Sequence, residues 1–72
     1  MKTFAETLKY YRTINGFTQS ELADKTGISQ QRISYYERGT RVPSLDDCVK
    51  LADVFGISLD ELAGREYGKA ND

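Results

Sequence analysis

Residues 18–39 read TQSELADKTGISQQRISYYERG, a stretch that contains the signals for two short helices joined by a tight turn. Thr18 and Glu21 have the spacing of a capping box, which begins a helix by bonding two otherwise unpaired backbone N–H groups. Gly27 suits the left-handed conformation that ends a helix, and Ser29 is a favoured N-cap for the next one. Four apolar side chains are spaced to meet between the two helices: Leu22, Ile28, Ile33 and Tyr36. The stretch therefore predicts a helix-turn-helix hairpin.

Similar signals on both sides of this hairpin predict three more helices. Thr3 with Glu6, and Ser58 with Glu61, repeat the capping-box spacing, and Ser44 is a further N-cap candidate. No segment alternates apolar and polar residues over the length of a strand, so a sheet is not expected. The sequence predicts an all-α, compact five-helix bundle, with helices at residues 4–14, 19–25, 30–38, 45–55 and 59–63.

The length of the chain indicates one domain, and its apolar periodicity predicts some of the core residues. With 72 residues the chain has room for one small domain, assigned to residues 1–64, followed by a polar C-terminal tail at residues 65–72. The stripe of the fourth helix that is expected to face the core consists of Leu45, Cys48, Ala52 and Phe55. In that position Cys48 is interpreted as a small buried hydrophobic residue rather than as a redox group.

The residue inventory excludes most enzyme chemistry. The chain has no histidine, the side chain on which general acid–base catalysis and metal binding most often depend. One cysteine forms neither an internal disulfide nor a four-ligand zinc site. We therefore expect no enzyme activity, no catalytic residue, no metal and no cofactor. The sequence also has no apolar run of about 18 residues and no signal peptide, so we expect no membrane association. A single cysteine, which forms no internal disulfide, favours a cytoplasmic location.

Charge is distributed unevenly along the chain, although its net value is only −1. Residues 1–43 carry seven Lys/Arg and four Asp/Glu, a net charge of +3, whereas residues 44–72 carry three and seven, a net charge of −4. This asymmetry favours one polar partner for the basic half. The alternative is an imbalance of charges on solvated faces, which needs no partner.

Together these motifs resemble the Cro/cI-type helix-turn-helix domain, the XRE or lambda-repressor-like family of phage repressors and bacterial regulators. The matching segments are Thr18-Gln19-x-Glu21-Leu22-Ala23, Gly27-Ile28-Ser29, Ile33-Ser34-x-Tyr36-Glu37-x-Gly39, Pro43 and Leu51-Ala52-x-x-Phe55-Gly56-Ile57-Ser58. The resemblance covers residues 3–63. It implies a bundle of five helices that binds double-stranded DNA in a sequence-specific way, with the second and third helices as the reading unit.

The third helix carries the candidate base contacts. If Ile33 and Tyr36 face inward, a helical wheel directs Gln31, Ser34, Tyr35 and Arg38 outward, and it leaves Gln30 near the start and Arg32 on a flank. Polar side chains on such a helix suit the major groove, where base edges present hydrogen-bond donors and acceptors. The resemblance also implies base contacts at several of these positions. The predicted set is Gln30, Gln31, Arg32, Ser34, Tyr35 and Arg38, the alternative being a solvated polar face.

Contacts to the DNA backbone are expected on either side of the third helix. Thr18 and Gln19 begin the second helix, where unpaired N–H groups and the positive end of the helix dipole suit a phosphate. Arg41 follows the third helix and is placed for the next phosphate, or is simply a solvated loop charge. Glu37 lies in the last turn of its helix, where the dipole disfavours an acid, so we expect an ion pair with Arg12. The resemblance implies the same structural pair.

The whole sequence predicts a transcriptional regulator, most often a repressor in the family it resembles, that binds an inverted repeat as a homodimer. Dimerisation is expected mainly on DNA, through a surface that includes Val54 and Leu59. The alternative is a protein-interaction module, such as an antitoxin or adaptor, that uses the same fold to bind a protein partner. One departure from the family is the Tyr35-Tyr36 pair, because Tyr36 brings a hydroxyl group near the core that needs a hydrogen-bond partner.

Overall fold

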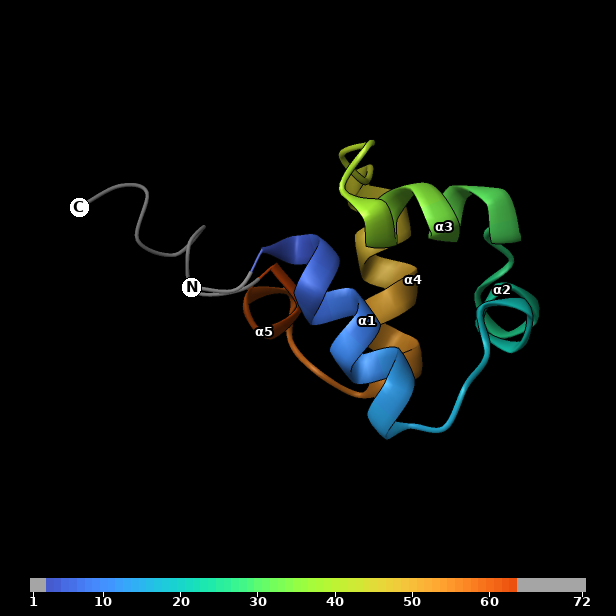
Figure 1. The fold of residues 1–72 in the computed structure, drawn as a ribbon. Helices are drawn as coiled ribbons and strands as arrows, with labels where there is room; N and C mark the ends of the chain where they lie inside the picture. Colours follow the sequence, from blue (N-terminus) through green and yellow to red (C-terminus); the bar gives the residue numbers. More distant parts are fainter. Residues whose placement is uncertain (1–2, 64–72) are drawn as a thin grey trace.

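A computed structural model describes residues 3–63, and within that range the chain is all-helical (Figure 1). The five helices are α1 (Phe4–Ile14), α2 (Gln19–Thr26), α3 (Gln30–Arg38), α4 (Leu45–Phe55) and α5 (Leu59–Ala63). The predicted fold class is confirmed, and the helix bounds agree except that α2 continues through Thr26. That extra residue remains helical because the chain leaves the helix only at Gly27, whose φ of 77° is left-handed and whose N–H donates to the Ala23 carbonyl. The predicted tail lies outside the described residues.

Capping boxes fix the starts of three helices. At α1 and α2, the threonine hydroxyl accepts from the backbone N–H three residues later and the glutamate there accepts from the threonine N–H. Ser58 and Glu61 make the same reciprocal bonds at α5, at 2.9 and 3.1 Å. Each pair satisfies two backbone donors that the helix itself leaves unpaired. Local chemistry therefore accounts for where these helices begin.

The core lies where the hairpin of α2 and α3 packs against the other helices. Each of the five helices contributes one fully buried side chain and the turn between α2 and α3 adds another: Leu8, Leu22, Ile28, Ile33, Leu51 and Leu62. In Figure 1, α2 is seen nearly end-on while α3 runs across the view, so the two helices of the hairpin cross steeply. The four residues predicted to meet within the hairpin are all buried. The helix α1 packs against both α3 and α5. The inner side of α3 is therefore packed against the core, and its outer side is left free.

The predicted core stripe of α4 is wrong at its first position. Leu45 is 72% exposed, and Cys48 is half-buried, whereas Ala52 and Phe55 are buried as expected. In the first turn of α4 it is Asp47 that is buried against α3, and Leu45 instead lines an open hollow with the exposed Val42. Burial raises the pKa of the Cys48 thiol, with a further contribution from the nearby Asp47 carboxylate. In the described part of the chain, no helix is both long and apolar enough to cross a membrane.

Candidate nucleic-acid interface

The outward face of α3 is organised around Tyr35. Gln31, one turn earlier, donates from Nε2 to the Tyr35 hydroxyl at 3.0 Å. The guanidinium groups of Arg38 and Arg41 lie over the Tyr35 ring, 5.3 and 5.0 Å from its centroid. These four residues form what we call the tyrosine cluster. Cation–π attraction holds the two positive charges beside the helix surface, so the cluster joins hydrogen-bonding groups and cations in one place.

The other predicted base contacts occupy different positions on α3. Gln30 is the first residue of the helix and is exposed, next to Ser29, whose hydroxyl caps the helix by accepting from the Arg32 N–H at 3.1 Å. Ser34 is half-buried. The structure thus brings Gln31, Tyr35 and Arg38 together with Arg41, and it leaves Gln30 and Ser34 outside that cluster.

The structure joins Arg12 and Glu37 in a nearly buried ion pair. Arg12 donates from Nε and Nη2 to the two Glu37 carboxylate oxygens, the second at 3.0 Å, and from Nη1 to the Phe17 carbonyl at 2.9 Å. The two side chains are only 15% and 5% exposed. The hydrogen bond with Glu37 raises the pKa of Arg12, against the opposing effect of its partial burial. This pair links α1 to the end of α3.

Both residues predicted to contact phosphate at the start of α2 are engaged within the chain. Gln19 donates from Nε2 to Glu37 Oε1 at 3.1 Å, which adds α2 to the two helices that Glu37 already joins. The Thr18 hydroxyl accepts from the Glu21 N–H at 3.0 Å in the capping box. A phosphate at this helix start would therefore meet backbone N–H groups rather than the Thr18 hydroxyl.

Arg32 does not extend freely from the helix, because its guanidinium is bound to Asp47 on α4. Nε donates to Asp47 Oδ2 at 3.2 Å and Nη2 donates to Oδ1 at 3.0 Å. The Tyr36 hydroxyl also donates to Asp47 Oδ2. Sequence reasoning named Arg32 but missed Asp47. The sequence did indicate that the Tyr36 hydroxyl needs a hydrogen-bond partner near the core. Asp47 is that partner.

Tyr36 gives the domain a distinctive response to high pH. Burial raises the pKa of Tyr36 above its ordinary value of 10.0, and its hydrogen bond to Asp47 raises it further. A raised folded-state pKa means that the native protein keeps the proton after the unfolded chain has lost it, so this contribution to stability is complete below about pH 10 and declines as the pH rises further. Urea unfolding at about pH 9 and pH 11 should therefore show a steeper loss in the wild type than in Tyr36→Phe. Parallel losses in the two proteins would contradict this expectation.

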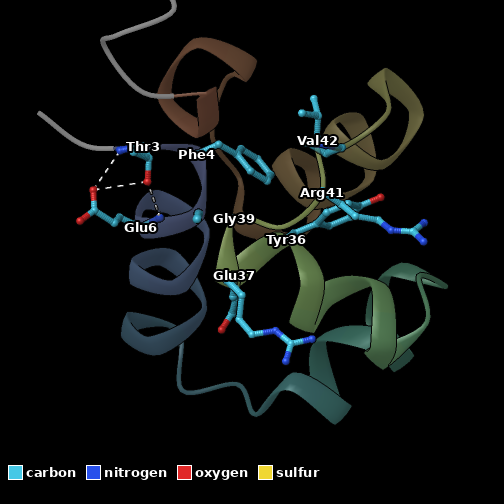
Figure 2. A pocket seen from close by; sticks show the side chains of 11 residues that line it. Thr3, Phe4, Glu6, Tyr36, Glu37, Gly39, Arg41 and Val42 are labelled. Carbon is cyan, nitrogen blue, oxygen red and sulfur yellow. Dashed lines mark hydrogen bonds between the residues drawn. The ribbon is translucent and has the colours of Figure 1, made fainter.

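Two further surfaces lie near the loop between α3 and α4. Figure 2 looks into an open groove, with the Thr3–Glu6 capping box on one side and Arg41 and Val42 on the other. Its carboxylates have partners in the fold, since Glu37 pairs with Arg12 and Glu6 closes the capping box. The second surface is an apolar hollow lined by Phe4, Val42, Pro43, Leu45, Cys48, Leu59 and Ala63.

The two residues predicted for a dimer surface differ in exposure. Leu59 is 42% exposed and lines the apolar hollow, as do the more exposed Val42 and Leu45. Val54 is half-buried and packs against the core cluster, so it contributes little to an outer surface. The exposed apolar side chains near α5 are therefore those of the hollow rather than Val54.

Comparison with known proteins places this geometry among DNA-binding domains. A family model described as helix-turn-helix matches residues 8–62. An HTH-type transcriptional regulator of Methanocaldococcus jannaschii is 42% identical over 55 residues, which span 76% of this chain and 83% of that protein. The cryptic phage CTXphi transcriptional repressor RstR of Vibrio cholerae is 42% identical over 60 residues, covering 83% of this chain and 54% of the repressor.

A solved structure shows the same arrangement. The N-terminal DNA-binding domain of SinR from Bacillus subtilis superposes with a TM-score of 0.81 at 31% identity, over 85% of this chain and 90% of that domain. Several curated relatives are longer, because this chain spans about half the length of RstR and of similar regulators.

Proposed function

The chain belongs to the helix-turn-helix family of DNA-binding transcription regulators, and on that premise we propose that it is a repressor that reads an inverted repeat as a homodimer. Members of this family are regulators and not enzymes. The observation that supports the proposal best is the tyrosine cluster on the outer face of α3, where amide, hydroxyl and guanidinium groups meet. A face with these donors and acceptors suits the major groove, which admits one helix. Repression then follows from occupying DNA that polymerase needs, and such a role places the protein in the cytoplasm with its DNA.

We assign base reading to six residues of α3: Gln30, Gln31, Arg32, Ser34, Tyr35 and Arg38. A glutamine amide pairs with both N7 and N6 of adenine, and the Tyr35 ring can pack on a thymine methyl group. The hydrogen bond between Gln31 and Tyr35 fixes the direction of both side chains before DNA arrives. Ordering them in advance reduces the entropy that binding must remove.

Backbone contacts in this proposal come from both sides of α3. Arg41 is held over Tyr35 and extends the cationic surface beyond the helix end. At the other side, the N–H groups of Gln19 and its neighbours at the start of α2 meet a second phosphate, while the Gln19 side chain stays bound to Glu37. Such contacts supply affinity and set the register of α3 in the groove without reading sequence.

Dimerisation in this proposal uses the apolar hollow. Val42, Leu45 and Leu59 are exposed apolar side chains on adjacent segments, and a self-complementary surface needs such a group near a two-fold axis. Half-sites read by such a dimer lie about 34 Å apart, one turn of DNA. The same hollow is what supports the alternative function, a module that binds a different protein.

Selection of bound duplexes from a randomised DNA library, at near-physiological salt, tests the proposed function directly. The expected result is a short inverted repeat whose half-sites are one helical turn apart. A folded, concentrated sample that enriches no sequence would contradict DNA reading and would favour the protein-interaction alternative. A single half-site, with no repeat, would retain DNA reading and reject the homodimer.

Replacing Gln31 by alanine should relax specificity at one position of each half-site. The substitution removes a bidentate base contact and the bond that orients Tyr35, so discrimination there should fall by about 1–3 kcal/mol. Competition binding against duplexes that vary one base pair at a time measures this change. Equal weakening on every duplex would show that Gln31 does not read a base.

Replacing Arg41 by alanine should weaken binding to all duplexes by a similar factor. The loss of one phosphate contact reduces the slope of log K against log salt by about one. Titrations of wild type and variant at four salt concentrations, on the best and on a scrambled duplex, provide the comparison. A loss confined to the best duplex would reassign Arg41 to base reading.

A further inference from the structure

We propose that Asp47 is a positioning residue for DNA recognition, which holds the Arg32 guanidinium so that its outer edge reads a guanine in the major groove. This inference rests on the proposed function, because it needs α3 to enter that groove. Asp47 lies on α4, outside the helix-turn-helix hairpin. A reading unit confined to α2 and α3 would not include it.

The bonds between Arg32 and Asp47 leave one edge of the guanidinium available. An arginine has five N–H donors in a rigid planar fork. Nε and Nη2 each donate once to the two carboxylate oxygens, at 3.2 and 3.0 Å. One N–H of Nη1 and the second N–H of Nη2 point in parallel from the adjacent, terminal edge of the same plane. The Arg32 side chain remains 42% exposed, which leaves room for a partner beside the Asp47 carboxylate.

Guanine is the base that fits two parallel donors. Its major-groove edge presents the acceptors O6 and N7 side by side, whereas adenine presents the donor N6–H₂ beside its N7. The two N–H groups of Arg32 would therefore bond twice to guanine, and at adenine one of them would face another donor. Arg32 is the third residue of α3, near the end of the helix from which recognition helices reach base edges.

Asp47 is itself held tightly, which is what makes it an effective support. Its side chain is 5% exposed, its N–H donates to the Ser44 hydroxyl at 3.1 Å, and its Oδ2 also accepts from the Tyr36 hydroxyl. It lies in the first turn of α4, where the helix dipole favours a negative charge. The hydrogen bond to Asp47 also raises the pKa of Arg32. The guanidinium is thus oriented before DNA arrives, so little further side-chain entropy is lost on binding.

The same pairing argues for a base and against a phosphate as the partner. Phosphates attract net positive charge, and Asp47 already balances the charge of Arg32. Arg32 therefore offers a partner its directional N–H donors rather than a net charge. Base edges are recognised by such directional hydrogen bonds. Arg32 should consequently contribute to sequence preference and little to the salt dependence of binding, the reverse of what we expect for Arg41.

The test compares the wild type with Asp47→Asn, using Asp46→Asn as the matched control. Asp46 is the adjacent carboxylate on α4, exposed and paired with Lys50, so its replacement removes the same charge from the same turn without touching Arg32. Library selection and salt titration are made on all three proteins, after thermal unfolding has shown that each is folded. In the wild type and Asp46→Asn, one half-site position should be guanine. In Asp47→Asn, that preference should fall about tenfold or more, and the salt slope should steepen by about one as Arg32 becomes an unbalanced cation.

The possible outcomes separate this inference from the proposed function. A wild type that selects no DNA overturns both. A wild type that selects an inverted repeat, with an unchanged guanine preference in Asp47→Asn, retains the regulator and overturns the role of Asp47. If Asp47→Asn does not fold, Asp47→Glu takes its place, because it keeps the charge and shifts the carboxylate that holds Arg32 by one methylene group. A weakened guanine preference at an unchanged salt slope then supports the inference. An unchanged guanine preference in Asp47→Glu rejects it.

Discussion

Replacing Arg12 by alanine is expected to lower the free energy of unfolding by about 3–5 kcal/mol, because it leaves the nearly buried Glu37 carboxylate without its cation. Gln19 remains as a donor to Glu37 Oε1, but one amide does not compensate a negative charge that is 5% exposed. A domain of this length has a total stability of roughly 4–11 kcal/mol, so the loss would be a large part of the total. Urea titration followed by far-ultraviolet circular dichroism measures the loss.

Lys9→Ala is the matched control, since it removes an exposed cation from the same helix. Its effect should stay within about 0.5 kcal/mol. Replacing the pair together, as Arg12→Met with Glu37→Leu, should recover most of the stability, because a buried pair gains little over well-packed apolar side chains. If Arg12→Ala were no less stable than Lys9→Ala, the pair would have no structural role.

Replacing Ile33 by alanine should cost about 2–5 kcal/mol of stability, since Ile33 is fully buried and the change leaves a cavity under the reading helix. Ile33→Val removes one methyl group and should cost about 0.5–1.5 kcal/mol. Ile14→Ala, on an exposed side of α1, should change stability by less than about 0.5 kcal/mol. Chemical denaturation of the three variants against wild type gives the ranking.

The Ile33 variant also separates stability from recognition. Ile33 faces the core and not the groove, so the folded fraction of Ile33→Ala should prefer the same DNA sequence as the wild type. Saturating specific duplex should raise its melting temperature, because a ligand that binds only the native state stabilises it. A changed base preference would show that α3 shifts on the core when this side chain is cut back.

Much of the fold follows from signals that lie within a few residues of each other. The starts of α1, α3, α4 and α5 are set by capping residues that can be recognised in the sequence. Leu45 shows where such reasoning stops. Periodicity says which side of a helix is apolar, but it does not say which residues of a turn the neighbouring helices cover. In the first turn of α4 they cover the polar Asp47, and Leu45 is left in solvent.

In the candidate site, too, contacts within one helix were predictable, and one contact between distant helices was not. The outward direction of Gln31 and Tyr35 was predictable, because both belong to one helix whose inner face was evident. The pairing of Arg32 with Asp47 was not, because 15 residues separate them and the pairing depends on how α4 passes α3. The interaction of Glu37 with Arg12 could be predicted from the sequence. An acid in the last turn of a helix is disfavoured by the helix dipole and therefore indicates a basic partner.

The Arg32–Asp47 pair has an evolutionary consequence. Gln30 and Gln31 are exposed, so under the proposed function substitutions there would change the preferred DNA sequence with little effect on folding. A substitution at Arg32 instead removes the cationic partner of a carboxylate that the fold keeps buried. Divergence of operator preference in descendants of this chain should therefore proceed rapidly at the two glutamines. At Arg32 it should require a paired change at Asp47, so the base that we propose for Arg32 should be the slowest to change.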